Sequence, residues 1–288
     1  MFLSPAIALF TLFLLVPIGY AIYLSFVGLR VDGGAFGIRK QVFVGLENYI
    51  ASLTDPELLA SLGRLALFGA ISVPLTLGLA LVYALLLDLP GVRASRFSRT
   101  AIFIPYAVPG VIATLLWGFM YLPSTSPFTF VIEAIGLPAP DFLNSSSIYG
   151  SLSNIAIWSG LGFNMIVMYT ALRSIPTEIY EAAKIDGASE WQIAWRIKIP
   201  LLTPALVLTL LFSLIATLQA YSEPTTLRSL SNSISFNFFP LMKVYRDAFA
   251  NDDLSGAAAT SVVLALGTLL ISLALLRVLQ RRTFEESK

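Results

Sequence analysis

The chain has 288 residues, of which 57% are hydrophobic and only 12% are charged, and its formal net charge is +1. A soluble domain usually carries about 25% charged residues, so this chain has too few of them to cover a surface that faces water. The composition therefore excludes an ordinary soluble globular enzyme and indicates a protein whose solvent is the lipid bilayer.

Several kinds of functional site are excluded by the residue types that the sequence lacks. The chain contains no cysteine and no histidine. Disulfides, thiolate metal sites, Ser-His-Asp catalysis and imidazole proton relays are therefore excluded, and we expect no metal site. The 18 basic residues are scattered along the chain, so nucleic-acid binding has no electrostatic basis.

Six stretches of the sequence are apolar over about the 20 residues that a helix needs to cross a bilayer. They cover residues 3–26, 63–88, 100–122, 149–172, 201–222 and 257–280. The first has no basic leader and exceeds the apolar core of a signal peptide, so we expect a retained helix. The pattern predicts an all-α polytopic membrane protein with six transmembrane helices, forming a single domain over residues 1–288.

Prolines and small residues within these stretches predict how the helices bend and pack. Four prolines fall inside them, namely Pro17, Pro74, Pro105 and Pro109. Each removes a backbone donor and tends to kink a helix. Small residues cluster at 159–162 and 256–260 and favour close helix approach, with a helix of this chain or with one of a second subunit.

The basic residues predict the orientation of the chain in the membrane. With the amino terminus inside, segments 89–99, 173–200 and 281–288 are cytoplasmic and hold ten Lys or Arg residues, including Arg93 and Lys288. The outside segments hold six. We therefore expect both termini in the cytoplasm, because the inverted topology would place the densest basic loops outside.

The segment between the fourth and fifth stretches, residues 175–200, is long and patterned where a connector would be short. Gly187 suits the left-handed residue that ends a helix. Ser189 and Gln192 have capping-box spacing, so a second helix is expected to begin there and to run until Pro200. The pattern predicts a rigid helix-turn-helix projection that fits a groove on a partner. A hairpin lying on lipid head groups fits the periodicity equally well.

Eight residues of this segment stand at the spacing of a known motif. They are Glu181, Ala182, Ala183, Asp186, Gly187, Ala188, Ile197 and Pro200. The pattern resembles the EAA motif of permease subunits from binding-protein-dependent ABC importers, although Ala194 replaces a common aromatic residue and Ile199 a leucine. Residues 43–49 and 103–106 resemble the carbohydrate-uptake branch, whereas residues 222–235 lack its Thr-Gly-Gly-Gly-Pro element.

The resemblance implies a membrane subunit that is not an enzyme and binds no cofactor itself, and the chain has no G-x-x-x-x-G-K-[ST] sequence. It implies a complex in a bacterial or archaeal cytoplasmic membrane. The implied partners are a second related permease, two ATPase subunits that carry ATP and Mg, and an extracytoplasmic substrate-binding protein. Segment 175–200 is then the loop that couples ATPase closure to alternating access for a sugar or polyol-type solute.

Aromatic and amide side chains on the spans are candidates for the substrate pathway, because stacking and amide hydrogen bonds commonly hold sugars. The candidates are Tyr106, Asn154, Trp158, Asn164 and Gln219. The fifth stretch also carries a polar stripe, which fits a water-filled cavity and interhelical packing equally well. The stripe includes Thr209, Ser213 and Thr217.

Two other classes of membrane protein agree less well with the sequence. A secondary solute carrier, the main alternative, usually has charged residues inside its spans for ion coupling, but Asp88, Glu223 and Arg277 stand only near span ends. A membrane enzyme would need a dense charged group. Residues 251–253 are the candidate, and a solvated loop explains them more simply.

Overall fold

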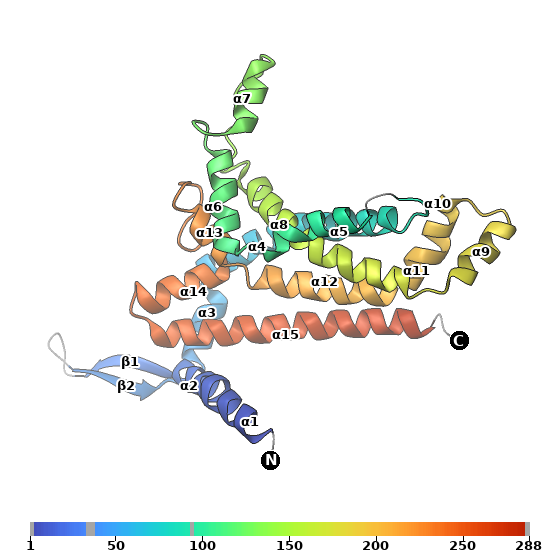
Figure 1. Ribbon diagram of the computed structural model, residues 1–288. Helices are drawn as coiled ribbons and strands as arrows, with labels where there is room; N and C mark the ends of the chain where they lie inside the picture. The colour runs from blue at the N-terminus through green and yellow to red at the C-terminus, as the bar shows by residue number, and fades with distance from the viewer. Residues whose placement is uncertain (1–2, 33–37, 93–94, 286–288) are drawn as a thin grey trace. The chain divides into compact units, whose positions relative to one another are not determined.

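The computed structural model is helical over most of its length (Figure 1). It describes residues 3–32, 38–92 and 95–285. Arg93 and Lys288, two of the basic residues on which the predicted orientation depends, lie outside the described residues.

Contacts divide the chain into two compact units. The first comprises residues 1–65 and 236–271, and the second comprises residues 66–235 and 272–288. The boundaries between the units fall within two 32-residue helices, α4 (Pro56–Leu87) and α15 (Leu254–Glu285).

The first unit begins with an apolar helix and a β-hairpin. The helix consists of α1 (Ser4–Phe10), a π-helical turn (Thr11–Leu15) and α2 (Val16–Ser25). The hairpin pairs β1 (Val27–Asp32) antiparallel with β2 (Ile38–Phe43). The prediction of an all-α membrane protein is confirmed, although nothing in the hydropathy pattern indicated this hairpin.

Two short helices, α3 (Glu47–Thr54) and α14 (Pro240–Phe249), complete the first unit. The hydroxyl oxygens of Ser52 on α3 and Thr260 on α15 lie 2.9 Å apart. Ala257, Ala258 and Ala259 are buried beside them. The small residues near the start of α15 therefore pack within this chain.

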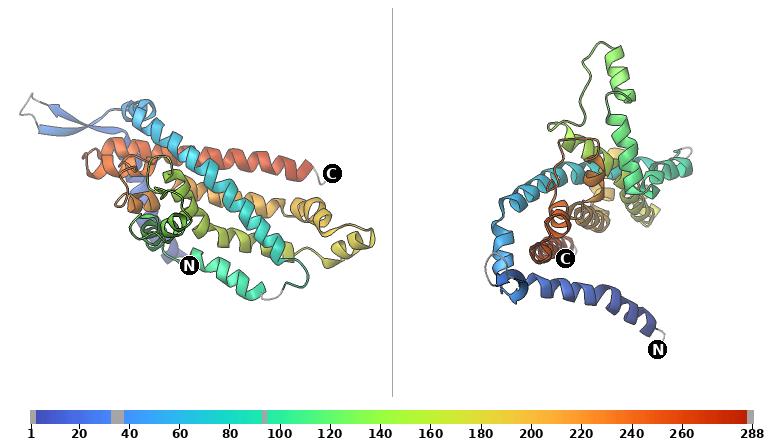
Figure 2. Two further views of the ribbon diagram at one scale, coloured as in Figure 1. Left: turned by 90° about the horizontal axis from the view of Figure 1, so that it is seen from above. Right: turned by 90° about the vertical axis from the view of Figure 1, so that its left-hand side faces the viewer.

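The second unit contains the remaining helices. Its first half comprises α5 (Ser95–Phe103), a 3-10 turn (Ile104–Ala107), α6 (Gly110–Tyr121), α7 (Pro127–Ala134) and α8 (Ile148–Arg173). Its second half comprises α9 (Thr177–Ile185), α10 (Glu190–Ile193), a π-helical turn (Ala194–Lys198), α11 (Ile199–Leu201), α12 (Thr203–Leu218) and α13 (Ser222–Leu227). Both α5 and α12 pack along α8 (Figures 1 and 2).

Four helices among the described residues are long and apolar enough to cross a membrane without a break. They are Ser4–Ser25, Pro56–Leu87, Ile148–Arg173 and Leu254–Arg277. Two further pairs of helices satisfy the same test but are bent, by 98° for Ser95–Ala107 with Gly110–Tyr121 and by 65° for Glu190–Leu201 with Thr203–Leu218. If each bent pair is one span, the number is the predicted six, with the third and fifth spans broken.

The prolines differ in their effect on the helices. The 98° bend of the third span lies between Pro105 and Pro109, as expected for residues that lack an amide donor. Pro74 lies inside α4 without interrupting it. The helix that was expected to run until Pro200 ends one residue later, at Leu201, and the chain bends at Leu202. The π-helical turn just before Pro200 changes the hydrogen-bond register there and accommodates the ring.

A close approach between α5 and α8 depends on Gly162. A Cβ atom at this position would lie 2.4 Å from the carbonyl oxygen of Ile102 and 2.7 Å from the Cα atom of Phe103. Both of these atoms belong to the backbone, which cannot move aside as a side chain can. This small-residue surface therefore also packs within the chain.

An apolar core holds α4, α8 and the start of α12 together at one end of the second unit. Its most buried members are Ala80, Ala84, Leu87, Met165, Met168, Leu172 and Leu202. These side chains are almost inaccessible to solvent, and close packing at native density makes such a core stiff. The helix-turn-helix of residues 175–200 projects from this stiff end.

Candidate functional site

The turn between α9 and α10 depends on a left-handed glycine. Gly187 has φ +82°. The amide of Gly187 donates to the carbonyl of Lys184 at 3.0 Å, and that of Ala188 donates to the carbonyl of Ala183 at 2.9 Å. These two bonds form a Schellman motif, which satisfies the last carbonyls of α9. The predicted glycine turn is present.

The second helix of the segment begins at the predicted cap. The amide of Gln192 donates to Ser189 Oγ at 3.3 Å, and the amide of Ser189 donates to Gln192 Oε1 at 2.8 Å. This reciprocal capping box fixes the direction in which α10 leaves the turn. The Lys184 ammonium also lies 2.6 Å from Glu190 Oε1 and joins the two helices across the turn.

The tip of the segment exposes large apolar side chains. Ile185 is 86% exposed, Trp191 71% and Trp195 54%. The two indole rings meet edge to face with centroids 5.6 Å apart. Trp195 stands next to Ala194, so an aromatic surface is present although the family's usual aromatic position is not aromatic. Exposed apolar patches mark surfaces that bind proteins or membranes, and tryptophan is enriched at both kinds of surface.

The eight residues of the EAA-like pattern are distributed over the tip and the inner side of the segment. Those exposed are Glu181, Ala182, Asp186, Gly187 and Pro200, and those half-buried are Ala183, Ala188 and Ile197. Ile193, which is outside the pattern, is fully buried. The segment thus has a packed inner side, while five of the pattern residues are open to contact from outside.

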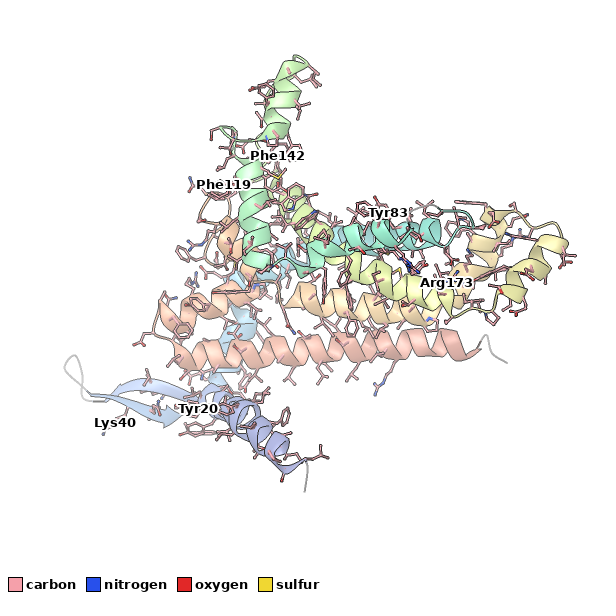
Figure 3. All side chains as sticks on the ribbon, in the orientation of Figure 1. Tyr20, Lys40, Tyr83, Phe119, Phe142 and Arg173 are labelled. Carbon is pink, nitrogen blue, oxygen red and sulfur yellow. The ribbon has the colours of Figure 1, made fainter. Side chains whose placement is uncertain are left out.

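A buried ion pair joins the base of the segment to α4. The Lys198 ammonium donates to Asp88 Oδ2 at 2.7 Å, and both side chains are about 5% exposed. The guanidinium of Arg173, at the end of α8, lies 3.8 Å from Asp88 Oδ1 (Figure 3). The Lys198 ammonium also lies 5.0 Å from the centre of the Tyr180 ring on α9. We call these four residues the base cluster.

Burial and the charges of the base cluster both shift the pKa of the Tyr180 hydroxyl. Burial, and after it the nearby Asp88 carboxylate, raise the pKa of Tyr180, and Arg173 only partly opposes them. Sequence reasoning missed this cluster, since Asp88 was noted only as a charge at a span end and Lys198 only as a basic loop residue. A signal was available, because a charge that directly follows an apolar span needs a partner when it is buried.

The predicted substrate-pathway residues fall into separate groups in the second unit. The Asn154 side chain donates to the Tyr121 hydroxyl at 2.8 Å, and the Trp158 ring meets Trp117 edge to face at 6.0 Å. Both residues lie on α8, and their partners lie on α6. Tyr106 stacks on Phe163 with ring centroids 5.1 Å apart. These contacts make two aromatic clusters on neighbouring parts of α8.

The other two pathway candidates lie elsewhere. Asn164 is buried, its side chain donates to the Gly160 carbonyl at 2.9 Å, and Ser213 Oγ lies 3.5 Å from its Oδ1. Gln219 caps the end of α12 and is exposed. The hydroxyls of Thr209 and Thr217 donate to carbonyls of their own helix, which agrees with packing more simply than with a water-filled cavity.

A second ion-pair cluster lies in the first unit, where α14 meets the start of α4. The Lys243 ammonium is buried, 2.6 Å from Asp55 Oδ2, and it also pairs with Asp247. Burial alone would lower the pKa of Lys243, but the hydrogen bonds to Asp247 and Asp55 outweigh it and raise that pKa. Burial would raise the pKa of Asp55, but the bond from Lys243, its charge and the backbone hydrogen bonds from Glu57 and Leu58 together outweigh burial and lower that pKa.

One cavity, with a volume of about 450 Å³, opens beside α7 and is lined by residues between Pro123 and Glu133. None of the predicted substrate-pathway residues lines it. Within the described parts of the chain, no three acidic side chains are grouped so that they could hold a metal ion. The clearest candidate site is therefore segment 175–200 with its base cluster.

Two comparisons of sequence relate this chain to known transport proteins. The model of the family described as "Binding-protein-dependent transport system inner membrane component" matches residues 77–285. The sn-glycerol-3-phosphate transport system permease protein UgpA of Brucella suis is 32% identical over 266 residues, which cover 91% of this chain and 87% of that protein. The osmoprotective compounds uptake permease protein GgtC of Synechocystis is 31% identical over 228 residues, which cover 77% of this chain and 78% of that protein.

A comparison with solved structures agrees in fold. A chain from the crystal structure of a bacterial ABC transporter involved in the import of the acidic polysaccharide alginate superposes with a TM-score of 0.82 at 23% identity, covering 97% of this chain and 94% of that chain. The family match spans most of the chain, and the relatives are permeases. This chain therefore belongs to the family of inner membrane components of binding-protein-dependent transport systems, and it is a transport permease rather than an enzyme.

Proposed function

We propose that this chain is the transmembrane permease subunit of an ATP-driven importer, with segment 175–200 as its coupling loop. The observation that carries the proposal is the form of that loop. Its tip exposes Ile185, Trp191 and Trp195, while its base is held to the spans by a buried ion pair. A projection that is rigid, apolar at its tip and anchored at its base can bind a partner protein and transmit a displacement of that partner to the spans.

Within the coupling loop we assign roles to the residues of the EAA-like pattern. Glu181 offers an exposed carboxylate to the partner, and Ala182 and Ala183 permit its close approach. Asp186, Gly187 and Ala188 form the turn. Ile197 and Pro200 lead the chain back to the broken fifth span. This assignment places the loop, and with it both chain termini, on the cytoplasmic side of a bacterial or archaeal membrane.

The proposed assembly contains one copy of this chain as a single transmembrane domain over residues 1–288. Its partners are a second related permease, two ATPase subunits and an extracytoplasmic binding protein. ATP and Mg are bound by the ATPase subunits, since this chain has no phosphate-binding P-loop sequence. Nucleotide closure moves the coupling loops, and the permease pair changes from inward-facing to outward-facing.

The proposed solute is a sugar or a related polyol. The relatives named above take up sn-glycerol-3-phosphate and osmoprotective compounds, and the protein of similar fold belongs to an importer of a polysaccharide. The aromatic clusters around Tyr106 and Trp158, with Asn154, Asn164 and Gln219, are the side chains we propose for its pathway. Alanine at each of these positions should change the uptake kinetics, and a residue whose replacement changes nothing is removed from the pathway.

The experiment that tests the proposal is purification of the tagged chain from its native membrane in mild detergent, followed by mass spectrometry of the proteins recovered with it. We expect a second permease and an ATPase with a P-loop. The recovered complex should move solute into liposomes only when ATP is supplied on the side of the coupling loop. A chain that came out alone and moved solute without ATP would contradict the proposal and establish a secondary carrier instead.

A further inference from the structure

The base cluster connects α4 to the coupling loop, in addition to the two helices that flank the loop in the sequence. The loop is joined through the chain to α8 at one end and to α12 at the other, whereas α4 has no such covalent connection to it. Asp88 directly follows α4, and its amide donates to the Ala84 carbonyl at 3.1 Å, so that it continues the last turn of that helix. Lys198 ends the π-helical turn of the loop, 110 residues further along. Their contact is therefore made by tertiary packing alone.

The contact differs in kind from the apolar packing around it. The attraction between apolar side chains has no direction and does not select particular pairs of atoms. The hydrogen bond from Lys198 to Asp88 has a donor, an acceptor and a preferred distance. Because both side chains are nearly inaccessible to solvent, separating them would leave the Lys198 ammonium buried without a carboxylate and Asp88 with only the more distant Arg173, which is strongly unfavourable.

The remaining members of the base cluster restrain the pair from two sides. Arg173 approaches the second carboxylate oxygen of Asp88 from the end of α8. The Tyr180 ring lies beside the Lys198 ammonium and belongs to α9, the first helix of the loop. Beneath them, Leu87, Leu172 and Leu202 belong to the stiff apolar core. Movement of the π-helical turn therefore acts directly on Asp88 through Lys198, and movement of α9 acts on Lys198 through the Tyr180 ring.

We propose that the Asp88–Lys198 pair makes α4 move together with the coupling loop. The displacement of the loop in each cycle of ATP hydrolysis then reaches α4 as well as α8 and α12. The inference rests on the proposed function and deepens it. Neither residue contacts solute or nucleotide in this proposal. Both act as positioning residues, through which the displacement of the loop reaches α4.

The test measures solute taken up per ATP hydrolysed by the reconstituted complex of both permeases, the ATPases and the binding protein. We expect Asp88→Asn and Lys198→Gln each to lower this ratio at least fivefold while ATP hydrolysis continues. The reversed pair, Asp88→Lys with Lys198→Asp, should recover at least half of the ratio, because Arg173 is largely exposed and can turn away from the new lysine. Lys243→Gln is the matched control, since it breaks a buried ion pair outside the base cluster and should leave the ratio unchanged.

A single variant that leaves one charge buried can fail to assemble, so an apolar pair supplies a second test. Asp88→Leu with Lys198→Met removes both charges and keeps the packing, a change that buried ion pairs often tolerate. We expect this variant to assemble and to show the lowered ratio. A ratio at the wild-type level, in the assembled apolar pair or in an assembled single variant, would overturn the inference. Absence of ATP-driven uptake by the wild-type complex would instead overturn the proposed function, and the inference with it.

Discussion

Gly187 offers a test of backbone conformation that is free of steric overlap. Its φ of +82° costs an L-residue about 1–2 kcal/mol. A Cβ atom there would meet nothing within 4 Å. Within this chain, the effect of a side chain at this position must therefore come from strain in the turn, which would move α10 relative to α9.

We expect Gly187→Val to reduce ATP-driven uptake at least tenfold while the amount of chain in the membrane stays the same. Gly187→Asn should retain most of the uptake, because asparagine tolerates the left-handed region. Gly136→Val is the control, since Gly136 also has a positive φ and open space around it but lies outside the coupling loop. Normal uptake by Gly187→Val would contradict the assigned role of the turn.

The Asp55–Lys243 pair predicts a dependence of stability on pH. Because the pKa of Asp55 is lowered in the folded chain, its contribution is present above the ordinary value of 3.8 and is lost as the pH falls. Because the pKa of Lys243 is raised, its contribution is present below 10.5 and is lost only at more alkaline pH.

We therefore expect Asp55→Asn to lower the melting temperature of the detergent-purified chain at neutral pH. The difference from the wild type should shrink as the pH falls below 3.8 and through the lowered pKa of the folded carboxyl, because the wild-type side chain then becomes neutral as well. Thermal unfolding of both proteins across this range measures the effect. A difference that stayed constant with pH would show that Asp55 does not act through its charge.

The packing of α5 on α8 can be tested with two glycines one half-turn apart on the same helix. A Cβ atom at Gly162 overlaps the backbone of Ile102, whereas one at Gly160 would make ordinary contacts with the Thr76 methyl group at 3.6 Å and the Asn164 side-chain nitrogen at 3.9 Å. We expect Gly162→Ala to destabilise the chain by about 1–3 kcal/mol. Gly160→Ala should be neutral or slightly stabilising, because alanine favours helix. Equal melting temperatures for the two variants would contradict the close approach.

In the proposed importer, the exposed tip of the coupling loop is the surface that we expect to bind the ATPase. Buried tryptophans are frequent hot spots of protein interfaces, and losing one costs about 2 kcal/mol or more, roughly thirtyfold in affinity. We expect Trp191→Ala and Trp195→Ala each to weaken the binding of the ATPase roughly thirtyfold and to reduce its recovery with the tagged chain accordingly. Phe130→Ala, which removes an equally exposed ring from α7, should leave recovery unchanged. Full recovery with both tryptophans replaced would place the ATPase contact elsewhere.

Local patterns in the sequence were sufficient to predict much of this fold and part of the site. The membrane class, four of the spans, the glycine turn and the capping box each depend on residues that are neighbours along the chain, so hydropathy and spacing reveal them. The bend of the third span follows from Pro105 and Pro109 in the same way. The π-helical turn at Ala194–Lys198, just before Pro200, shows the limit of such rules, because no residue pattern in the sequence indicated it.

Features made by residues distant in sequence could not be predicted in this way. Hydropathy showed that residues 159–162 were small, but only the packed structure showed that Gly162 lies against the backbone of α5. The charges of Asp88 and Lys198 were visible in the sequence, and their pairing was not, because 110 residues separate them and the contact exists only when α4, α8 and the coupling loop are packed together. Periodicity records which residue types recur along the chain, whereas the meeting of two buried charges depends on how the helices that carry them pack.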